Sequence, residues 1–309
     1  MPLNLKYIPQ ESIDFERWDR CVSAHPKPQP YGFSWYLNWV SERWDGIVYG
    51  DYEAVMPIFP KRKNGLDFTT RPYGTQALGP FSSILLDAQA TEDFVKFAMT
   101  KVRYGEFFLS PMVQIPGHWK SQKFSNYVLP THGCYEELVA KYSSQTKRNL
   151  KKANQIKLAP GSWTTVQDAL RLWKHSTQEK TNITDENLAR FEKVLEFCVY
   201  QKRAEVLSVF DEGNTLVAAQ VWITYAGRST LLVNASSEYG KSIGAPTLLI
   251  DQMVHSKSGM DHILDFEGSS IPGLARFYSG FGAIDEPFFF HVENQLPLWA
   301  RWIKPKTTR

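Results

Sequence analysis

The order of predicted helices and strands between residues 133 and 294 constrains the fold of this chain more than any other sequence feature. Apolar residues recur there with helical and strand periodicity in turn, and Gly, Pro, Asn and Asp separate the segments. The pattern predicts helices at 135–153, 165–180, 185–201, 247–258 and 272–280, and strands at 156–158, 204–210, 216–225, 229–236, 262–266 and 288–292. Three consecutive strands followed by alternating helices and strands predict an α/β fold with mixed, twisted sheets flanked by helices.

Residues 1–132 predict a weaker version of the same plan. Strands are expected at 3–8, 47–49, 54–60, 68–71, 79–84, 107–109 and 127–129, with helices at 11–22, at 91–103 and after Ser34. Asn64-Gly65 predicts a tight hairpin turn, because both residue types tolerate positive φ. The length of 309 residues suits one large domain or two ordinary ones. Because a second, similar series of elements starts near residue 133, we expect one domain at 1–132 and another at 133–309.

Composition excludes several classes of protein. A hydrophobic fraction of 43% is typical of a globular chain rather than a disordered one. No apolar stretch approaches the ~20 residues that span a bilayer, and no signal-peptide pattern opens the chain, so we expect a cytoplasmic protein without a membrane span. The net charge of +3 permits anionic ligands but does not indicate DNA binding, which needs clustered charge. The three cysteines and the scattered histidines predict neither a disulfide framework nor a metal site.

Two acidic residues end the strand predicted at 262–266. Asp265 and Glu267 flank Phe266, so strand alternation would place both carboxylates on one face. Adjacent carboxylates repel each other, and the pKa of one rises unless a cation or an amine lies between them. A carboxylate of this kind can accept the proton of an amine nucleophile. Alternatively, the pair caps the loop that begins at Gly268 or binds lysines.

The residues that follow resemble a known family. Asp265-x-x-Gly268 precedes the pattern Leu-x-x-Phe-Tyr-x-x-Phe-Gly at 274–282. This arrangement is similar to the closing segment of acyl-CoA N-acyltransferase (GNAT) domains and, more closely, of FemAB-type aminoacyltransferases. The resemblance implies two tandem GNAT-like lobes, a degenerate one at 1–132 and one with the donor site at 133–309. It also implies transfer of an acyl or aminoacyl group to an amine, with acyl-CoA or aminoacyl-tRNA as the co-substrate.

Tyr278 takes its expected role from that resemblance. In GNAT enzymes a tyrosine in this helix protonates the leaving thiolate, while Asp265 or Glu267 would here accept the proton of the amine. FemAB-type sequences usually have Lys at this position, so Tyr278 favours an acyl-CoA donor over aminoacyl-tRNA. Arg276, in the same helix, is expected to contact the substrate. The alternative is an ordinary half-buried helix tyrosine.

A glycine-containing segment before the helix at 247–258 corresponds to the GNAT pyrophosphate loop. Gly240, Gly244 and Ala245 would allow a phosphate to approach the backbone, and Lys241 would add a positive charge. The spacing differs from the GNAT motif, and Pro246 removes one N–H donor, although proline is ordinary in a first helical turn.

Other candidate substrate contacts are scattered along the chain. Lys147 and Arg148 belong to a basic run that a bound phosphate or tRNA end would stabilise, although cations also suit the C-terminal half of a helix. Gln220 lies on a central strand and could line a donor channel or belong to the core. Arg71 and Tyr73 occupy a polar loop that could contact the acceptor.

These observations favour an N-acyltransferase that moves an acyl group from acyl-CoA to an amine of a small molecule or a peptidoglycan precursor. Two alternatives stay open. One is aminoacyl-tRNA-dependent transfer to a cell-wall precursor, with tRNA as a partner. The other is a non-catalytic binding protein that retains the fold, since a fold alone does not fix function.

Overall fold

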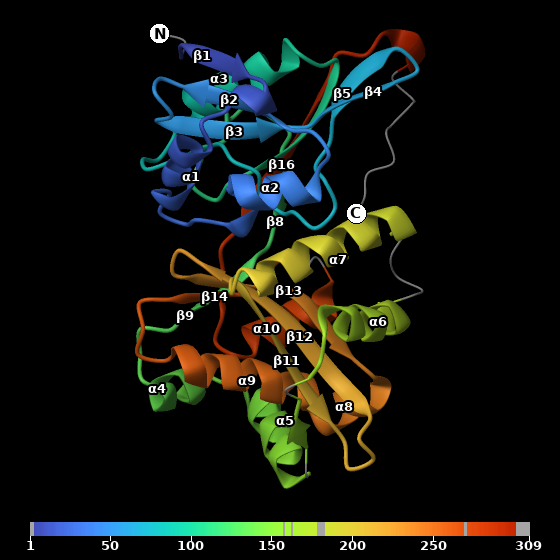
Figure 1. The fold of residues 1–309 in the computed structure, drawn as a ribbon. Coiled ribbons are helices and arrows are strands. Elements are labelled where there is room, and N and C mark those ends of the chain that lie inside the picture. The colour runs from blue at the N-terminus through green and yellow to red at the C-terminus, as the bar shows by residue number, and fades with distance from the viewer. Residues whose placement is uncertain (1–2, 157, 162, 178–182, 269–270, 301–309) are drawn as a thin grey trace. The chain divides into compact units, whose positions relative to one another are not determined.

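The computed structural model describes residues 3–156, 158–161, 163–177, 183–268 and 271–300 (Figure 1). The chain divides into two compact units, the first formed by residues 1–124 and 287–309 and the second by residues 125–286. The sequence predicts a boundary at 132/133 and a second domain that extends to the C-terminus. The structure instead places 125–132 in the second unit and 287–309 in the first.

The first unit contains two sheets, with strand orders β1-β2-β3-β6 and β4-β5-β7-β16-β8. Its strands are β1 (Leu5–Ile8), β2 (Asp45–Tyr49), β3 (Ala54–Ile58), β4 (Pro60–Lys63), β5 (Leu66–Thr69), β6 (Phe81–Ser82), β7 (Tyr104–Leu109), β8 (Gln122–Phe124) and β16 (Phe288–Asn294). Its helices are α1 (Phe15–Ser23), α2 (Ser34–Val40) and α3 (Ala88–Met99), with short 3₁₀ turns at Gln10–Ser12, Pro30–Gly32 and Leu298–Ala300. Phe94 and Val95 of α3 pack against Ile47, Met56 and Phe107 to form its core.

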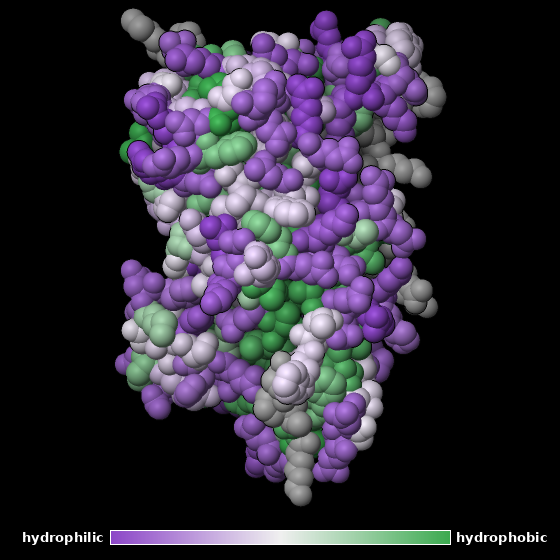
Figure 2. Space-filling view, viewed as in Figure 1, coloured by the Kyte–Doolittle hydropathy of each residue, from purple (hydrophilic) through white to green (hydrophobic). Residues whose placement is uncertain are grey.

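The second unit is built on one seven-stranded sheet of order β10-β11-β12-β13-β14-β9-β15. Its strands are β9 (Tyr127–Pro130), β10 (Ala159–Pro160), β11 (Ala204–Phe210), β12 (Leu216–Tyr225), β13 (Arg228–Ser236), β14 (Ile263–Asp265) and β15 (Ile284–Asp285). Its helices are α4 (Tyr135–Ala140), α5 (Ser144–Gln155), α6 (Val166–Thr177), α7 (Asp185–Tyr200), α8 (Glu238–Ile243), α9 (Ala245–Lys257) and α10 (Pro272–Ser279). Trp222 and Leu231 of the sheet pack against Ile250 and Met253 of α9. Apolar side chains gather over β12 and β13 (Figure 2).

Mixed sheets flanked by helices confirm the predicted fold class. The Asn64-Gly65 turn is also confirmed, with φ values of 51° and 77° between β4 and β5. The long helix predicted at 135–153 is wrong, because it is divided into α4 and α5. Ser143 stops it: the backbone N–H of Ser143 binds the Gly280 carbonyl, and its side chain caps α5 at Thr146.

The last strand is the other main difference from the predicted plan. β16 follows the sequence of the second unit but pairs with β7 and β8 of the first. Within the second unit, β9 occupies the position beside β14, in antiparallel register. β9 therefore pairs on one edge of the strand that ends at Asp265, and β13 pairs on the other.

Candidate active site

The candidate site lies where β13 and β14 stop pairing. Parallel pairing joins Arg228–Thr230 to Ile263–Asp265, after which β14 ends while β13 continues to Ser236. Among the described residues, no strand pairs with 231–236 on that side. An unpaired strand edge leaves backbone N–H and C=O groups available to a ligand. The register with β12 also shifts between Val221 and Trp222, which marks a bulge in this part of the sheet.

Asp265 is buried in an ion network at the end of β14. Arg228 Nε donates to its Oδ2 at 2.8 Å, and a terminal nitrogen of Arg228 lies 2.7 Å from both Asp265 and Glu286. Asp265 Oδ1 accepts the backbone N–H of Glu267 at 2.9 Å. Because both oxygens of Asp265 are engaged, this geometry suits a structural carboxylate rather than the predicted base.

Glu267 follows the end of the strand and has a left-handed backbone, with φ of 62°. The prediction that Asp265 and Glu267 share one strand face is wrong, because β14 ends at Asp265. Burial raises the pKa of the Glu267 carboxyl to about 8. A carboxyl group with a pKa near neutrality is suited to accept and return a proton.

Tyr278 lies close to Glu267. Its ring stacks on Phe266, with centroids 5.2 Å apart, and its hydroxyl accepts a hydrogen bond from Asn234 Nδ2 at 3.3 Å. Burial raises the pKa of Tyr278 to about 12, and the charge of Glu267 contributes to the rise. The phenol therefore keeps its proton at neutral pH, as a proton donor must.

Gln220 and Asn234 complete the polar groups here. Gln220 is fully buried and donates from Nε2 to Asn234 Oδ1 at 3.1 Å. The two residues are cross-strand partners on β12 and β13. Sequence reasoning missed Asn234, whose signal was one polar residue within the apolar run at 231–235. Gln220 proves to be a core residue that connects to the site through Asn234.

No family model matches the chain, and no curated protein matches it by sequence. Among solved structures it is similar to FemX, at 11% identity and a TM-score of 0.64, with 94% of this chain and 98% of that chain covered. A tandem GNAT protein from the clavulanic acid biosynthesis pathway aligns at 10% identity and a TM-score of 0.54, covering 95% and 99%. L-PGS from Bacillus licheniformis aligns at 8% identity and 0.51, covering 94% and 95%.

The chain has a two-lobed GNAT-like fold. At these identities the alignments establish the fold and leave the reaction open. They cover nearly the whole chain and nearly the whole of each neighbour, so the likeness extends over both units.

The segment expected to bind the donor pyrophosphate is largely helical. Residues 238–243 form α8, and Gly244 at φ 83° joins α8 to α9. A Cβ on Gly240 would lie 2.1 Å from the Val217 carbonyl oxygen, and one on Gly244 would lie 2.4 Å from that of Asn149. Both glycines therefore permit close approach within the protein. Whether they also approach a phosphate stays a prediction.

The charged residues around α8 and α9 are exposed or already paired. Lys241 Nζ lies 2.6 Å from Glu238, and Ala245 is buried. On α5, Lys147 donates to the Ala140 carbonyl and Arg148 donates to Gln145. Arg276 is exposed on α10.

Arg71 and Tyr73 lie in the first unit. The Arg71 guanidinium stacks over the Phe108 ring at 3.9 Å, and burial lowers its pKa to about 10. Burial raises the pKa of Tyr73 to about 12. The two side chains affect each other electrostatically, so the structure brings this predicted pair together.

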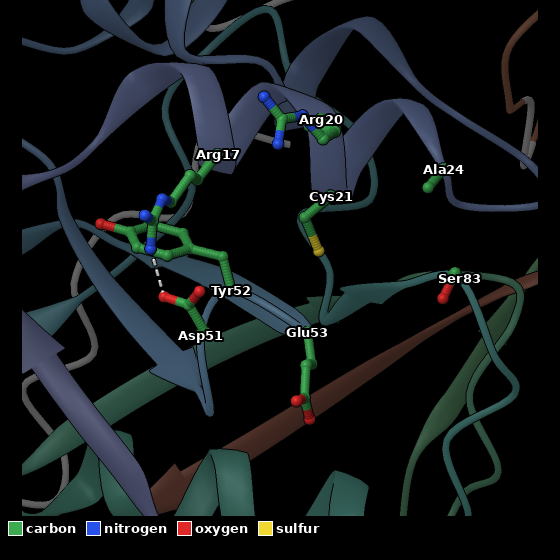
Figure 3. A pocket seen from close by; sticks show the side chains of 8 residues that line it. All are labelled: Arg17, Arg20, Cys21, Ala24, Asp51, Tyr52, Glu53 and Ser83. Atoms are coloured by element: carbon green, nitrogen blue, oxygen red, sulfur yellow. Dashed lines mark hydrogen bonds and ion pairs between the residues drawn. The ribbon is translucent and has the colours of Figure 1, made fainter.

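A pocket of about 290 Å³ in the first unit contains none of the predicted site residues (Figure 3). Arg17 pairs there with Asp51, Arg20 pairs with Glu16, and the Cys21 thiol donates to the Phe81 carbonyl. Burial raises the pKa of Cys21 to about 12, which disfavours the thiolate that a nucleophile needs. The lining of this pocket therefore does not favour Cys21 as a nucleophile.

The described part of the chain contains no group of three or more His, Cys, Asp or Glu residues that could hold a metal ion. None of its helices is both long enough and apolar enough to cross a membrane.

Proposed function

We propose that this protein is a cytoplasmic N-acyltransferase that moves an acyl group from acyl-CoA to the amine of a small molecule or a peptidoglycan precursor. One observation supports this best. Glu267, with a pKa near 8, and Tyr278, which stays protonated, lie together where β13 separates from β14.

The proposed chemistry assigns one proton transfer to each residue. Glu267 takes the proton of the amine as nitrogen attacks the thioester carbon. Backbone N–H groups of 231–236 stabilise the oxyanion that forms on the carbonyl oxygen. As the carbon–sulfur bond breaks, Tyr278 gives its proton to the departing thiolate. The rest of the rate enhancement comes from holding donor and acceptor in contact.

For the donor, we propose that the phosphates lie at residues 240–245, beside the α9 N-terminus. Lys241 supplies a positive charge that a phosphate could take over from Glu238. The phosphates would approach the backbone of Gly240, Gly244 and Ala245. Arg276 of α10 is a further proposed substrate contact, and Arg71 and Tyr73 are proposed contacts for the acceptor.

A second candidate is aminoacyl-tRNA-dependent transfer to a cell-wall precursor, which one observation favours. Helix α5 contains Lys147, Arg148, Lys151 and Lys152 and no acidic residue. A helix of this kind attracts a polyanion such as the end of a tRNA. The presence of Tyr278 where FemAB-type proteins usually have Lys argues against this candidate.

A direct assay separates the candidates. Purified protein is incubated with acetyl-CoA and a panel of primary amines, and free thiol is measured. We expect Glu267→Gln and Tyr278→Phe to lower kcat about 10²-fold or more, as is typical for loss of a general base or acid. Glu212→Gln and Tyr200→Phe, at exposed positions, serve as matched controls and should match the unmodified protein.

Three other results would change the assignment. Turnover with charged tRNA but not with acetyl-CoA would replace the first candidate with the second. Turnover that survives both active-site substitutions would refute the acid–base roles. Absence of turnover and of binding with either donor would favour a non-catalytic binding protein.

A further inference from the structure

A network of side-chain hydrogen bonds runs from the interior of the second unit's sheet to Tyr278. Trp222 and Gln220 lie two residues apart on β12, and therefore on the same face. The indole Nε1 of Trp222 donates to Gln220 Oε1 at 3.0 Å. Gln220 Nε2 donates to Asn234 Oδ1 at 3.1 Å, and Asn234 Nδ2 donates to the Tyr278 hydroxyl oxygen at 3.3 Å.

The indole determines which partner donates in every hydrogen bond of this network, because an indole N–H can only donate. Its partner on Gln220 must be the amide oxygen, so Nε2 points the other way. Nε2 there meets two acceptors, Asn234 Oδ1 and the Pro246 carbonyl at 3.3 Å. With Oδ1 of Asn234 used as an acceptor, only its Nδ2 remains to face Tyr278.

Burial holds the side-chain amides of this network in that orientation. Trp222 and Gln220 are both 0% exposed, so water cannot replace a lost partner. A flipped Gln220 amide would place N–H groups against the indole N–H and an oxygen against the Pro246 carbonyl. Each unsatisfied buried group of this kind costs about 1–3 kcal/mol, which disfavours the reverse arrangement.

Tyr278 is the last member of this hydrogen-bond network, and its role there is defined. Its oxygen accepts from Asn234, and among the described residues none accepts its hydroxyl proton. We propose that Trp222, Gln220 and Asn234 form a relay that makes Tyr278 an acceptor toward the protein and so reserves its proton for the leaving group. The inference rests on the proposed function. Asn234, Gln220 and Trp222 are positioning residues in it.

The proton balance of the reaction is closed by the two residues already described. The amine nitrogen bonds to the acyl carbon and loses one proton to Glu267. The carbon–sulfur bond breaks, its electron pair stays on sulfur, and the sulfur takes one proton from Tyr278. The proton held by Glu267 then passes to the Tyr278 phenolate and restores the phenol. The amine and the thioester thus give an amide and a thiol with no other reactant.

Asn234→Asp tests the direction of the relay, because a carboxylate has the same shape but can only accept. The Tyr278 hydroxyl would then donate to the new carboxylate and no longer to the leaving group. The probes are acetyl-CoA, whose thiolate needs a proton, and p-nitrophenyl acetate, whose phenolate leaves without one. Hydroxylamine serves as the amine in both assays.

We expect Asn234→Asp to lower kcat with acetyl-CoA about 10²-fold, the usual share of a general acid, while KM stays within about twofold. With p-nitrophenyl acetate, kcat should fall less than about threefold. Asn64→Asp, in an exposed turn of the first unit, is the matched control and should behave as the unmodified protein. Equal losses with both donors, or no loss with either, would overturn the relay.

A second measurement does not depend on activity. In ¹⁵N-labelled protein, the side-chain amides of Gln220 and Asn234 should each give one slowly exchanging pair of NMR signals. Trp222→Phe removes the donor that orients the network. Each of the two amides should then give two sets of signals, or its signals should broaden. Single, unshifted pairs in that variant would overturn the relay. The expected NMR result together with no acyl transfer by the unmodified protein would refute the proposed function but not the relay.

Discussion

The carboxylate of Asp265 holds the residue that follows it by two positions: its Oδ1 accepts the backbone N–H of Glu267 at 2.9 Å. The same carboxylate binds Arg228 through Oδ2. Glu267 leaves the strand with a positive φ, a conformation that costs a non-glycine residue about 1 kcal/mol or more. The buried ion network therefore determines where the proposed base lies, although Asp265 itself is not suited to be that base.

Arg228→Met should destabilise the protein strongly. The substitution leaves Asp265 and Glu286 buried without their shared guanidinium, and breaking a buried pair costs about 3–5 kcal/mol. Urea unfolding followed by tryptophan fluorescence measures the change. Arg17→Met, which breaks exposed pairs with Asp14 and Asp51, is the matched control and should cost less than about 1 kcal/mol. Equal losses for the two variants would show that the buried network is not a major source of stability.

Much of the second unit could be predicted from its sequence. The three strands β11, β12 and β13 and the helices α7 and α10 lie within a residue or two of their predicted bounds, because long periodic segments with clear turn residues leave little choice. The division of 135–153 into α4 and α5 could not be predicted in this way. It depends on a bond between Ser143 and the Gly280 carbonyl, which only the tertiary structure brings together.

The candidate site was predictable in part for the same reason. Glu267 and Tyr278 were found because a resemblance drew attention to 265–282, whereas Asn234 and Arg228 come from a strand that reads as ordinary sheet core. Their importance arises from contacts with residues 37–58 positions away, such as Tyr278 and Glu286. No local pattern records such contacts.

Gly244→Ala should destabilise the second unit more than its positive φ alone would. The residue has φ of 83°, and a Cβ there would lie 2.4 Å from the backbone oxygen of Asn149. Gly259→Ala is the matched control, since its φ of 75° is similar but no atom lies within 4 Å of the added Cβ. We expect about 1 kcal/mol for Gly259→Ala from the backbone and at least about 2 kcal/mol more for Gly244→Ala. Similar free energies of unfolding would show that α5 moves away without cost.

Lys241→Ala should weaken donor binding and leave stability unchanged. Its pair with Glu238 is exposed and spans i to i+3, so its loss costs little. If a CoA phosphate binds beside this lysine, Kd for CoA measured by calorimetry should rise about 5-fold or more, and the effect should shrink as salt is added. Lys63→Ala, exposed in the hairpin of the first unit, should leave Kd unchanged. An unaltered Kd in Lys241→Ala would place the phosphates elsewhere.

The raised pKa of Glu267 makes both activity and stability depend on pH. The folded pKa of about 8 lies above the ordinary glutamate pKa of 4.5, so the folded protein holds a proton that the unfolded chain releases between these two pH values. Stability should therefore fall as pH rises from about 5 to about 8 and then level off. Glu267→Gln removes this contribution, so its free energy of unfolding relative to the unmodified protein should rise between pH 5 and pH 9 by about 3 kcal/mol, less than the full shift would give because the carboxyl is only half-buried.

The activity profile has the opposite slope. Because the base must be ionised, kcat/KM should increase as pH rises through about 8 and reach a plateau above it. Glu212→Gln, at an exposed position, should reproduce the unmodified profiles for both stability and activity. The stability of Glu267→Gln relative to the unmodified protein could instead be the same at pH 5 and pH 9. That result would show that the Glu267 carboxyl has an ordinary pKa, and it would contradict the proposed role of Glu267 as the base.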